Sequence, residues 1–184
     1  MSFIFLILLS IMYPCTIGVA KDNNGDTFLW KNRDNSIIKN VNEIIIIPTI
    51  DNDIVYIDNS QNENLSYICV KTRHQEEEQK TYMGLNEEGF GIVNSVVLNN
   101  DDVDDQFREI NDEWEIFNKA LEQCASIDAF DNLIRSEINS NRNIIISSNF
   151  GVVDKEGNGS IFEISTYLGR DIRRIDLDEN TNYL

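Results

Sequence analysis

The hydrophobic pattern of the chain changes its period twice, and this change limits the folds open to it. Short apolar or alternating runs of strand length fill residues 15–98, a helical period follows over residues 107–134, and strand-like runs return after residue 143. Periods of two and of 3.6 residues indicate strands and helices respectively. Strands, then two helices, then strands predict an α+β or layered α/β domain rather than an alternating βαβ domain.

The expected strands are separated by segments rich in Asn, Asp and Gly, which favour turns. The first two flank such a segment at residues 21–26 and are expected to form a β-hairpin. The expected strands are residues 15–20, 27–32, 43–48, 54–58, 66–70, 82–85, 91–98, 143–147, 149–153 and 160–164.

Two helices are expected between the strand runs. The first has apolar residues at spacings of three and four over roughly five turns, and its start is acidic, which suits the positive end of the helix dipole. Ser126 is the expected N-cap of the second. The apolar positions are Phe107, Ile110, Trp114, Phe117, Leu121 and Cys124 in the first helix, and Ile127, Phe130, Leu133 and Ile134 in the second.

Charge and composition exclude several classes of function. The 184 residues include 32 Asp and Glu against 15 Lys and Arg, a net charge of −17. No basic face is therefore available for a nucleic acid, and an anionic membrane surface would repel the chain. One His and three Cys leave little material for a metal site, so we expect no metal and no organic cofactor.

The N-terminal residues resemble a secretion signal. Residues 3–13 are apolar over the length of a signal-peptide core, too short for a membrane span of about 20 residues. They lack a basic start and a small-residue cleavage pattern, so a buried first strand is the alternative. We expect residues 1–14 to be a signal-like or pro-segment, residues 15–184 to form the domain, and the mature protein to be secreted, periplasmic or lumenal.

A cysteine that becomes the first residue can act without a histidine. His74 is the only histidine and lies in a charged stretch typical of a solvated loop. If residues 1–14 are removed, however, the α-amine of Cys15, with an ordinary pKa of about 8, can accept the proton of its own thiol. This chemistry requires cleavage directly before Cys15.

Five blocks along the chain resemble N-terminal-nucleophile (Ntn) hydrolases. They are CT at residues 15–16 with WKNRD at 30–34, GLNEEGFGIVNS at 84–95, ALEQCAS at 120–126, NFGVVD at 149–154 and NTNY at 180–183. The resemblance is to the acyl-coenzyme A:6-aminopenicillanic acid acyltransferase-like autoproteolytic acyltransferases and hydrolases, with the choloylglycine hydrolase and penicillin V acylase group as more distant relatives. It implies a four-layer αββα sandwich, in which two antiparallel sheets lie between helix layers.

The resemblance also implies a site and a reaction. Cys15 would be the nucleophile that forms a thioester with the acyl group of a small linear amide. Asp34 would accept a hydrogen bond from the α-amine or orient it, and Arg33 would hold the Asp34 carboxylate ionised or position the nucleophile. Asn94 and Asn182 would supply the oxyanion hole. Asn180 stands where the family usually has Arg, which leaves acyl-group contacts there open.

The resemblance covers only the first part of such a sandwich. The sequence ends two residues after Asn182, whereas relatives continue with strands and helices that finish the second sheet and the pocket. We therefore expect a missing C-terminal half or a partner chain. Two alternatives stay open: a truncated or degenerate secreted domain without catalysis, and a dipeptidase of the Ntn type.

Overall fold

A computed structural model describes most of the expected core. The described residues are 16–22, 25–32, 37–40, 43–46, 52–72, 80–96, 113–141, 144, 146–166 and 170–177. The strands are β1 (Thr16–Lys21), β2 (Thr27–Asn32), β3 (Ile37–Asn40), β4 (Glu43–Ile46), β5 (Asn52–Ile57), β6 (Tyr67–Thr72), β7 (Thr81–Asn86), β8 (Gly91–Val96), β9 (Ser147–Val153), β10 (Gly159–Ser165) and β11 (Asp171–Asp176), and the helices are α2 (Glu113–Gln123) and α3 (Ile127–Ser140).

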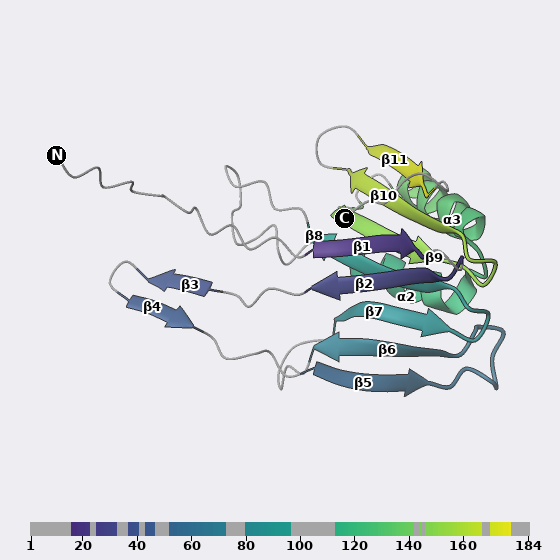
Figure 1. The fold of residues 1–184 in the computed structure, drawn as a ribbon, viewed down its shortest axis with the longest axis horizontal. Helices are drawn as coiled ribbons and strands as arrows, with labels where there is room; N and C mark the ends of the chain where they lie inside the picture. Colours follow the sequence, from purple (N-terminus) through teal and green to yellow (C-terminus); the bar gives the residue numbers. More distant parts are fainter. Residues whose placement is uncertain are drawn as a thin grey trace.

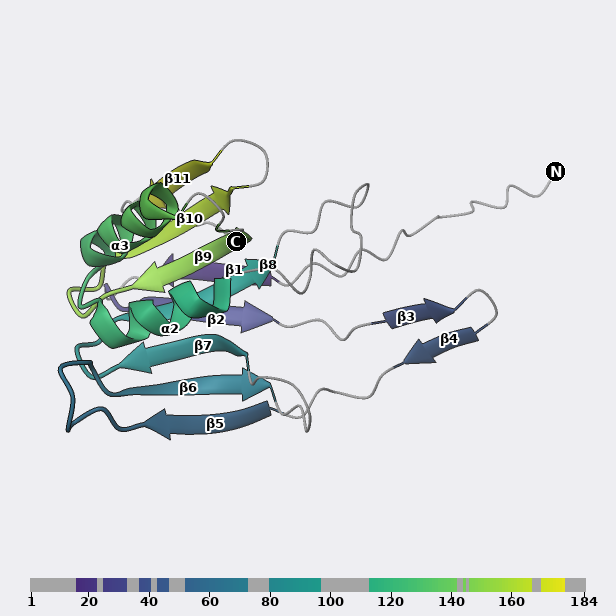
Figure 2. The same ribbon diagram turned by 180° about the vertical axis from the view of Figure 1, so that it is seen from behind.

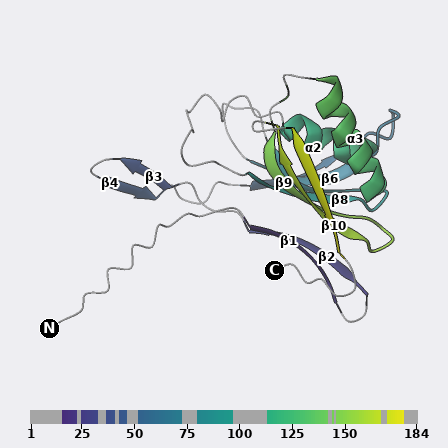
Figure 3. The same cartoon turned by 90° about the horizontal axis from the view of Figure 1, so that it is seen from above.

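Three layers are stacked in the order helices, large sheet, hairpin (Figures 1–3). The large sheet is antiparallel, with seven strands in the order β11-β10-β9-β8-β7-β6-β5. Helices α2 and α3 cover one face (Figure 2), and the β1–β2 hairpin lies on the other (Figure 3). These are three of the four layers expected from the sequence. Within the described ranges, strands β3 and β4 pair only with each other.

The core lies between the helices and the large sheet. Phe130 of α3 packs against the rings of Phe150 and Phe162, with ring centroids 5.7 and 5.0 Å away. Leu121 of α2 lies over Gly84 of β7, where a Cβ would be 2.5 Å from a Leu121 methyl carbon. The described part of the apolar face predicted for each helix therefore faces the sheet. Neither described helix is long and apolar enough to span a membrane.

The hairpin packs closely on the second face because that face is lined with glycine. A Cβ on Gly159 would lie 2.5 Å from a Val19 methyl carbon, and one on Gly151 would lie 3.1 Å from a Leu29 methyl carbon. Val19 is fully buried by this contact. The hairpin and the large sheet thus form a β-sandwich, whose sheets normally pack about 10 Å apart.

The structure corrects two parts of the strand prediction. A single strand, β9, takes the place of the two expected at 143–147 and 149–153, because Ser148 continues the ladder through Val96 and Ile164. Strands β3 and β11 were not predicted, and β11 lacks an apolar signal because Asp171, Arg173 and Arg174 occupy half of it. The start of the expected first helix, residues 107–112, lies outside the described residues.

The motif at residues 84–95 has a structural explanation. The buried Asn86 side chain donates to the backbone carbonyls of Leu121 (2.9 Å) and Cys124 (2.7 Å), at the end of α2. Its Oδ1 accepts from the amides of Glu88 and Phe90 in the β7–β8 turn. One amide group therefore joins the turn to a helix end whose carbonyls lack partners within the helix.

Two other motif residues also serve the fold. Ser126 caps α3 as expected, with its hydroxyl accepting from the amide of Ala129 at 3.2 Å. Asp154 closes the β9–β10 turn by accepting from the amide of Asn158 at 3.0 Å. These blocks of the Ntn resemblance therefore indicate fold rather than chemistry.

We expect Asn86→Ala to lower the free energy of unfolding by about 2–4 kcal/mol, because it leaves buried donors and acceptors without partners. Urea unfolding followed by circular dichroism measures this loss. Asn64→Ala is the matched control: its exposed side chain makes one 3.3 Å contact with Glu122, and its removal should change stability by less than about 0.5 kcal/mol. Equal effects of the two substitutions would contradict the role assigned to Asn86.

Candidate active site

Asn94 is the one predicted site residue within the described part of the chain. It lies on β8 opposite Phe150 of β9 and is fully buried. The β7–β8 ladder runs from Leu85–Gly91 to Met83–Val93, so Asn94 is the first residue beyond it. Its polar groups lie where the ladder ends, and their hydrogen bonds come from another strand.

The Lys31 ammonium supplies these hydrogen bonds. Its Nζ donates to Asn94 Oδ1 at 2.8 Å and also to the backbone carbonyl of Asn94. It lies 5.4 Å from the centroid of the Tyr82 ring, in cation–π range. The strand period explains this position, because Lys31 comes two residues after Leu29 and shares its sheet-facing side.

Lys31 fixes the orientation of the Asn94 amide. An ammonium group only donates, so it must face the Oδ1 end, and the Nδ2 end then points away. Asn94 Nδ2 is buried and has no hydrogen-bond partner among the described residues. A buried donor without an acceptor costs about 1–3 kcal/mol, and such groups are rare in native structures. The site therefore presents an oriented amide N–H group that can bind an oxygen atom.

The other predicted site residues lie outside the described residues. These are Cys15, Arg33, Asp34 and Asn182. Their described neighbours along the chain are close to Lys31: Thr16 at the start of β1 pairs with Asn32 at the end of β2, and Ile17 pairs with Lys31. The cation that contacts Asn94 is thus Lys31, which sequence reasoning did not select. Its place on the sheet-facing side of β2 was the signal that could have identified it.

The two described cysteines are not suited to nucleophilic chemistry. Cys69 and Cys124 are both buried and form no disulfide. Burial raises the pKa of Cys124 to about 12, and burial is also the main cause that raises the pKa of Cys69. Because the thiolate is the reactive form, both thiols are inert near neutral pH.

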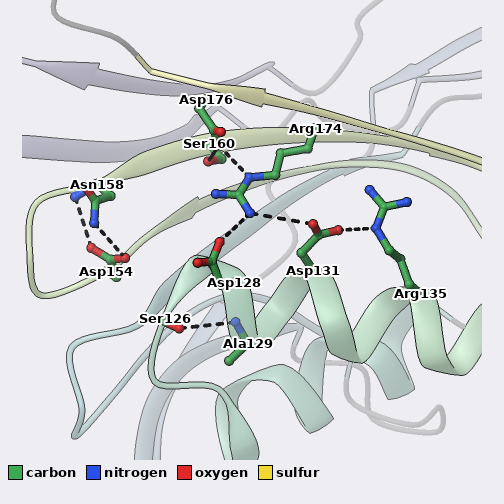
Figure 4. Close-up of polar contacts among 10 residues, drawn as sticks. All are labelled: Ser126, Asp128, Ala129, Asp131, Arg135, Asp154, Asn158, Ser160, Arg174 and Asp176. Atoms are coloured by element: carbon green, nitrogen blue, oxygen red, sulfur yellow. Dashed lines mark hydrogen bonds and ion pairs between the residues drawn. The ribbon is translucent and has the colours of Figure 1, made fainter.

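A second polar cluster lies where α3, β11 and the β9–β10 turn meet (Figure 4). Arg174 donates to Asp128 and Asp176, both at 2.6 Å, and Ser160 donates to Asp176. Burial opposes ionisation of Asp176, but the bonds from Ser160 and Arg174 outweigh it and lower the pKa of this carboxyl group. These groups satisfy one another and attach β11 to α3. Among the described residues, no group of His, Cys, Asp and Glu could hold a metal ion.

Comparisons with known proteins give similarity at the level of fold. No protein-family model and no curated protein sequence matches the chain. The fold is similar to solved structures of conjugated bile acid hydrolase from Clostridium perfringens. A cysteine-to-alanine variant gives a TM-score of 0.52 at 12% identity, and an arginine-to-leucine variant gives 0.51 at 14% identity.

Both alignments cover 89% of this chain and 51% of the hydrolase chain. The chain therefore spans about half the length of these solved structures. Bile acid hydrolase is an Ntn hydrolase of the choloylglycine hydrolase group, so the expected Ntn-hydrolase-like fold is confirmed as a distant similarity.

We expect Lys31→Met to lower the free energy of unfolding by about 1–3 kcal/mol, because two buried oxygen atoms lose a charged donor. Chemical denaturation measures this change. Lys119→Met is the control, since Lys119 makes a partly exposed ion pair with Glu137, which is worth at most about 1 kcal/mol. A Lys31 effect no larger than the control would show that the contact with Asn94 is not formed.

We expect iodoacetamide at about pH 8 to leave Cys69 and Cys124 unmodified in the folded protein, because both thiols are buried and protonated. Peptide mapping by mass spectrometry identifies the alkylated positions. The same reaction in concentrated guanidinium chloride should modify both residues and serves as the control. Rapid alkylation of either thiol in the native state would contradict their assignment as inert.

Proposed function

We propose that the protein is an N-terminal-cysteine amide hydrolase or acyltransferase that acts on linear amide C–N bonds through a thioester acyl-enzyme. The observation that carries the proposal is the oriented, buried Nδ2 group of Asn94, which has no hydrogen-bond partner in the described part of the chain. The similarity of fold to conjugated bile acid hydrolase supports the same class of reaction.

One covalent bond, one strand pairing and one hydrogen bond link the proposed nucleophile to Asn94. Cys15 is bonded to Thr16, the first residue of β1. The next residue, Ile17, pairs with Lys31, and the Lys31 ammonium holds the Asn94 side chain. The nucleophile and the amide donor are therefore expected at the same end of the sandwich, as a reaction at one carbonyl group requires.

In the proposed reaction the α-amine of Cys15 takes the proton of its thiol, and the thiolate attacks the amide carbonyl carbon. Asn94 Nδ2 donates to the oxygen atom as negative charge develops on it. Collapse of the tetrahedral intermediate breaks the C–N bond, and the leaving amine takes the proton held by the α-ammonium group. Water or a second amine then attacks the thioester and releases the acyl group.

The remaining roles follow the Ntn resemblance. Asp34 orients the α-amine, Arg33 holds the Asp34 carboxylate ionised, and Asn182 is the second oxyanion donor. Removal of residues 1–14, by signal peptidase on secretion or by autoproteolysis, is the activating step. The acyltransferase-like group is the proposed family, and small acyl amides are the proposed substrates.

The first experiment determines the N-terminus and the nucleophile. We expect mass spectrometry of the active protein to find Cys15 as its first residue. Cys15→Ser should lower turnover by orders of magnitude on a panel of N-acyl amides that includes a conjugated bile acid, with dipeptides assayed separately. An active protein that retains Met1, or unchanged turnover of Cys15→Ser, would exclude this mechanism.

We expect Asn94→Ala to lower kcat by about 10²–10³-fold, the usual effect of removing one oxyanion donor, while Cys15 still reacts with iodoacetamide. Asn132→Ala on the exposed side of α3 is the matched control and should retain full activity. Catalysis by Asn94→Ala at the rate of the control would contradict the role proposed for Asn94. Preferential turnover of dipeptides would favour the dipeptidase.

A further inference from the structure

Lys31 occupies a position that the strand pattern gives to an apolar side chain. It shares the sheet-facing side of β2 with Leu29, and Val19, which pairs with Leu29 on β1, is fully buried on the same side. Lysine is rarely placed between packed sheets, because burial of an ammonium group is costly unless its hydrogen bonds are satisfied. Departures from a local pattern are expected at functional sites. The charge of Lys31 therefore indicates a role beyond packing.

The two hydrogen bonds of Lys31 to Asn94 have different consequences. The bond to the backbone carbonyl occupies an acceptor where the β7–β8 ladder ends, so it serves the fold. The bond to Oδ1 at 2.8 Å acts instead on the side-chain amide. A donor to the carbonyl alone would leave this amide free to turn over, and it would then present Oδ1, which only accepts, as readily as Nδ2.

We infer, on the basis of the proposed function, that Lys31 is the positioning residue of the oxyanion donor. Its ammonium group holds the Asn94 amide so that Nδ2, rather than Oδ1, faces the substrate carbonyl oxygen. Asn94 Nδ2 has no hydrogen-bond partner within the described ranges, so its N–H group stays available for this oxygen. Lys31 acts through the Asn94 amide and does not itself bond to the reacting atoms.

The charge of Lys31 also strengthens this donor. The ammonium group, the Asn94 amide and the carbonyl oxygen form one chain, in which Nζ donates to Oδ1 and Nδ2 donates to the substrate. A charged group at one end of such a chain polarises the next hydrogen bond. Because the negative charge on the oxygen is largest in the transition state, the bond gains more there than in the bound substrate. Lys31 is therefore expected to affect kcat more than KM.

The first test is steady-state kinetics on the N-acyl amide that the wild-type protein hydrolyses fastest, at a temperature where circular dichroism shows each variant folded. We expect Lys31→Met to lower kcat by about 10–10²-fold with little change in KM, the effect of losing a hydrogen bond to a charged group. Lys31→Arg keeps the charge and the donors and should recover most of this loss. Lys119→Met, which removes a charge from an ion pair on α2, should keep full activity. An unchanged kcat in folded Lys31→Met would overturn the inference.

A double variant shows whether Lys31 acts through Asn94. Asn94→Ala removes the amide, so adding Lys31→Met to it should lower kcat by less than about twofold more. If the two losses multiplied in full, the ammonium group would act elsewhere and the inference would be wrong.

Alkylation of Cys15 separates this role from a direct effect on the nucleophile. Iodoacetamide reacts with the thiolate and needs no oxyanion donor, so Cys15 of Lys31→Met should react at the wild-type rate and with the same pH dependence. A slower reaction would show that the ammonium group stabilises the thiolate rather than the Asn94 amide. Unchanged turnover in Cys15→Ser would by contrast reject the proposed function itself, and with it the role of Lys31.

A measurement without turnover tests the geometry. In protein labelled with ¹⁵N-asparagine, the side-chain amide signal of Asn94 is the NMR signal that Asn94→Ala removes. We expect this signal to shift in Lys31→Met and to return toward its wild-type position in Lys31→Arg, whereas Lys119→Met leaves it in place. A signal that Lys31→Met does not move would contradict the inference whatever the kinetics show.

Discussion

The close packing of the β1–β2 hairpin on the glycine-lined face of the large sheet is the contact on which the rest of the structure depends. A side chain at Gly159 would meet Val19 and Leu177 at 2.5 and 2.6 Å, so the two layers fit together only without one. This contact buries Val19 and sets the height of β2 above β8. The contact of Lys31 with Asn94 depends on that height, because Lys31 lies on β2 and Asn94 lies on β8.

Local patterns in the sequence predicted most elements of the fold. Apolar residues at helical spacing predicted α2 and α3, and Ser126 predicted the start of α3. Short apolar or alternating runs predicted most of the strands. Strand β11 was not predicted from the sequence, because edge strands need little apolar surface. Arginine and aspartate occupy much of this strand. The break expected near Ser148 was absent because strands on both sides pair with it, and neighbours from distant parts of the chain cannot be read from a local window.

The candidate site was harder to predict because its residues act across layers. Asn94 was selected through a family resemblance, whereas the structure gives a physical reason. Lys31 holds one end of this buried amide, and the other end has no partner in the part of the chain that the structure describes. The sequence analysis gave Lys31 no role, although its place on the sheet-facing side of β2 was a signal. The pairing of β1 with β2 and the packing of the hairpin on β8 show that Lys31 contacts Asn94.

The second sheet, which has two strands among the described residues, carries Lys31 of the candidate site. The hairpin that carries Lys31 is a two-stranded sheet, and such a sheet has little stability of its own in water. It is held by the large sheet on one face, while one edge has no partner among the described residues. A strand bound at that edge would restrict the hairpin and with it the Lys31–Asn94 contact, since the edge belongs to the same strand as Lys31. A strand bound at the edge of β2 would in this way act on the orientation of the Asn94 amide.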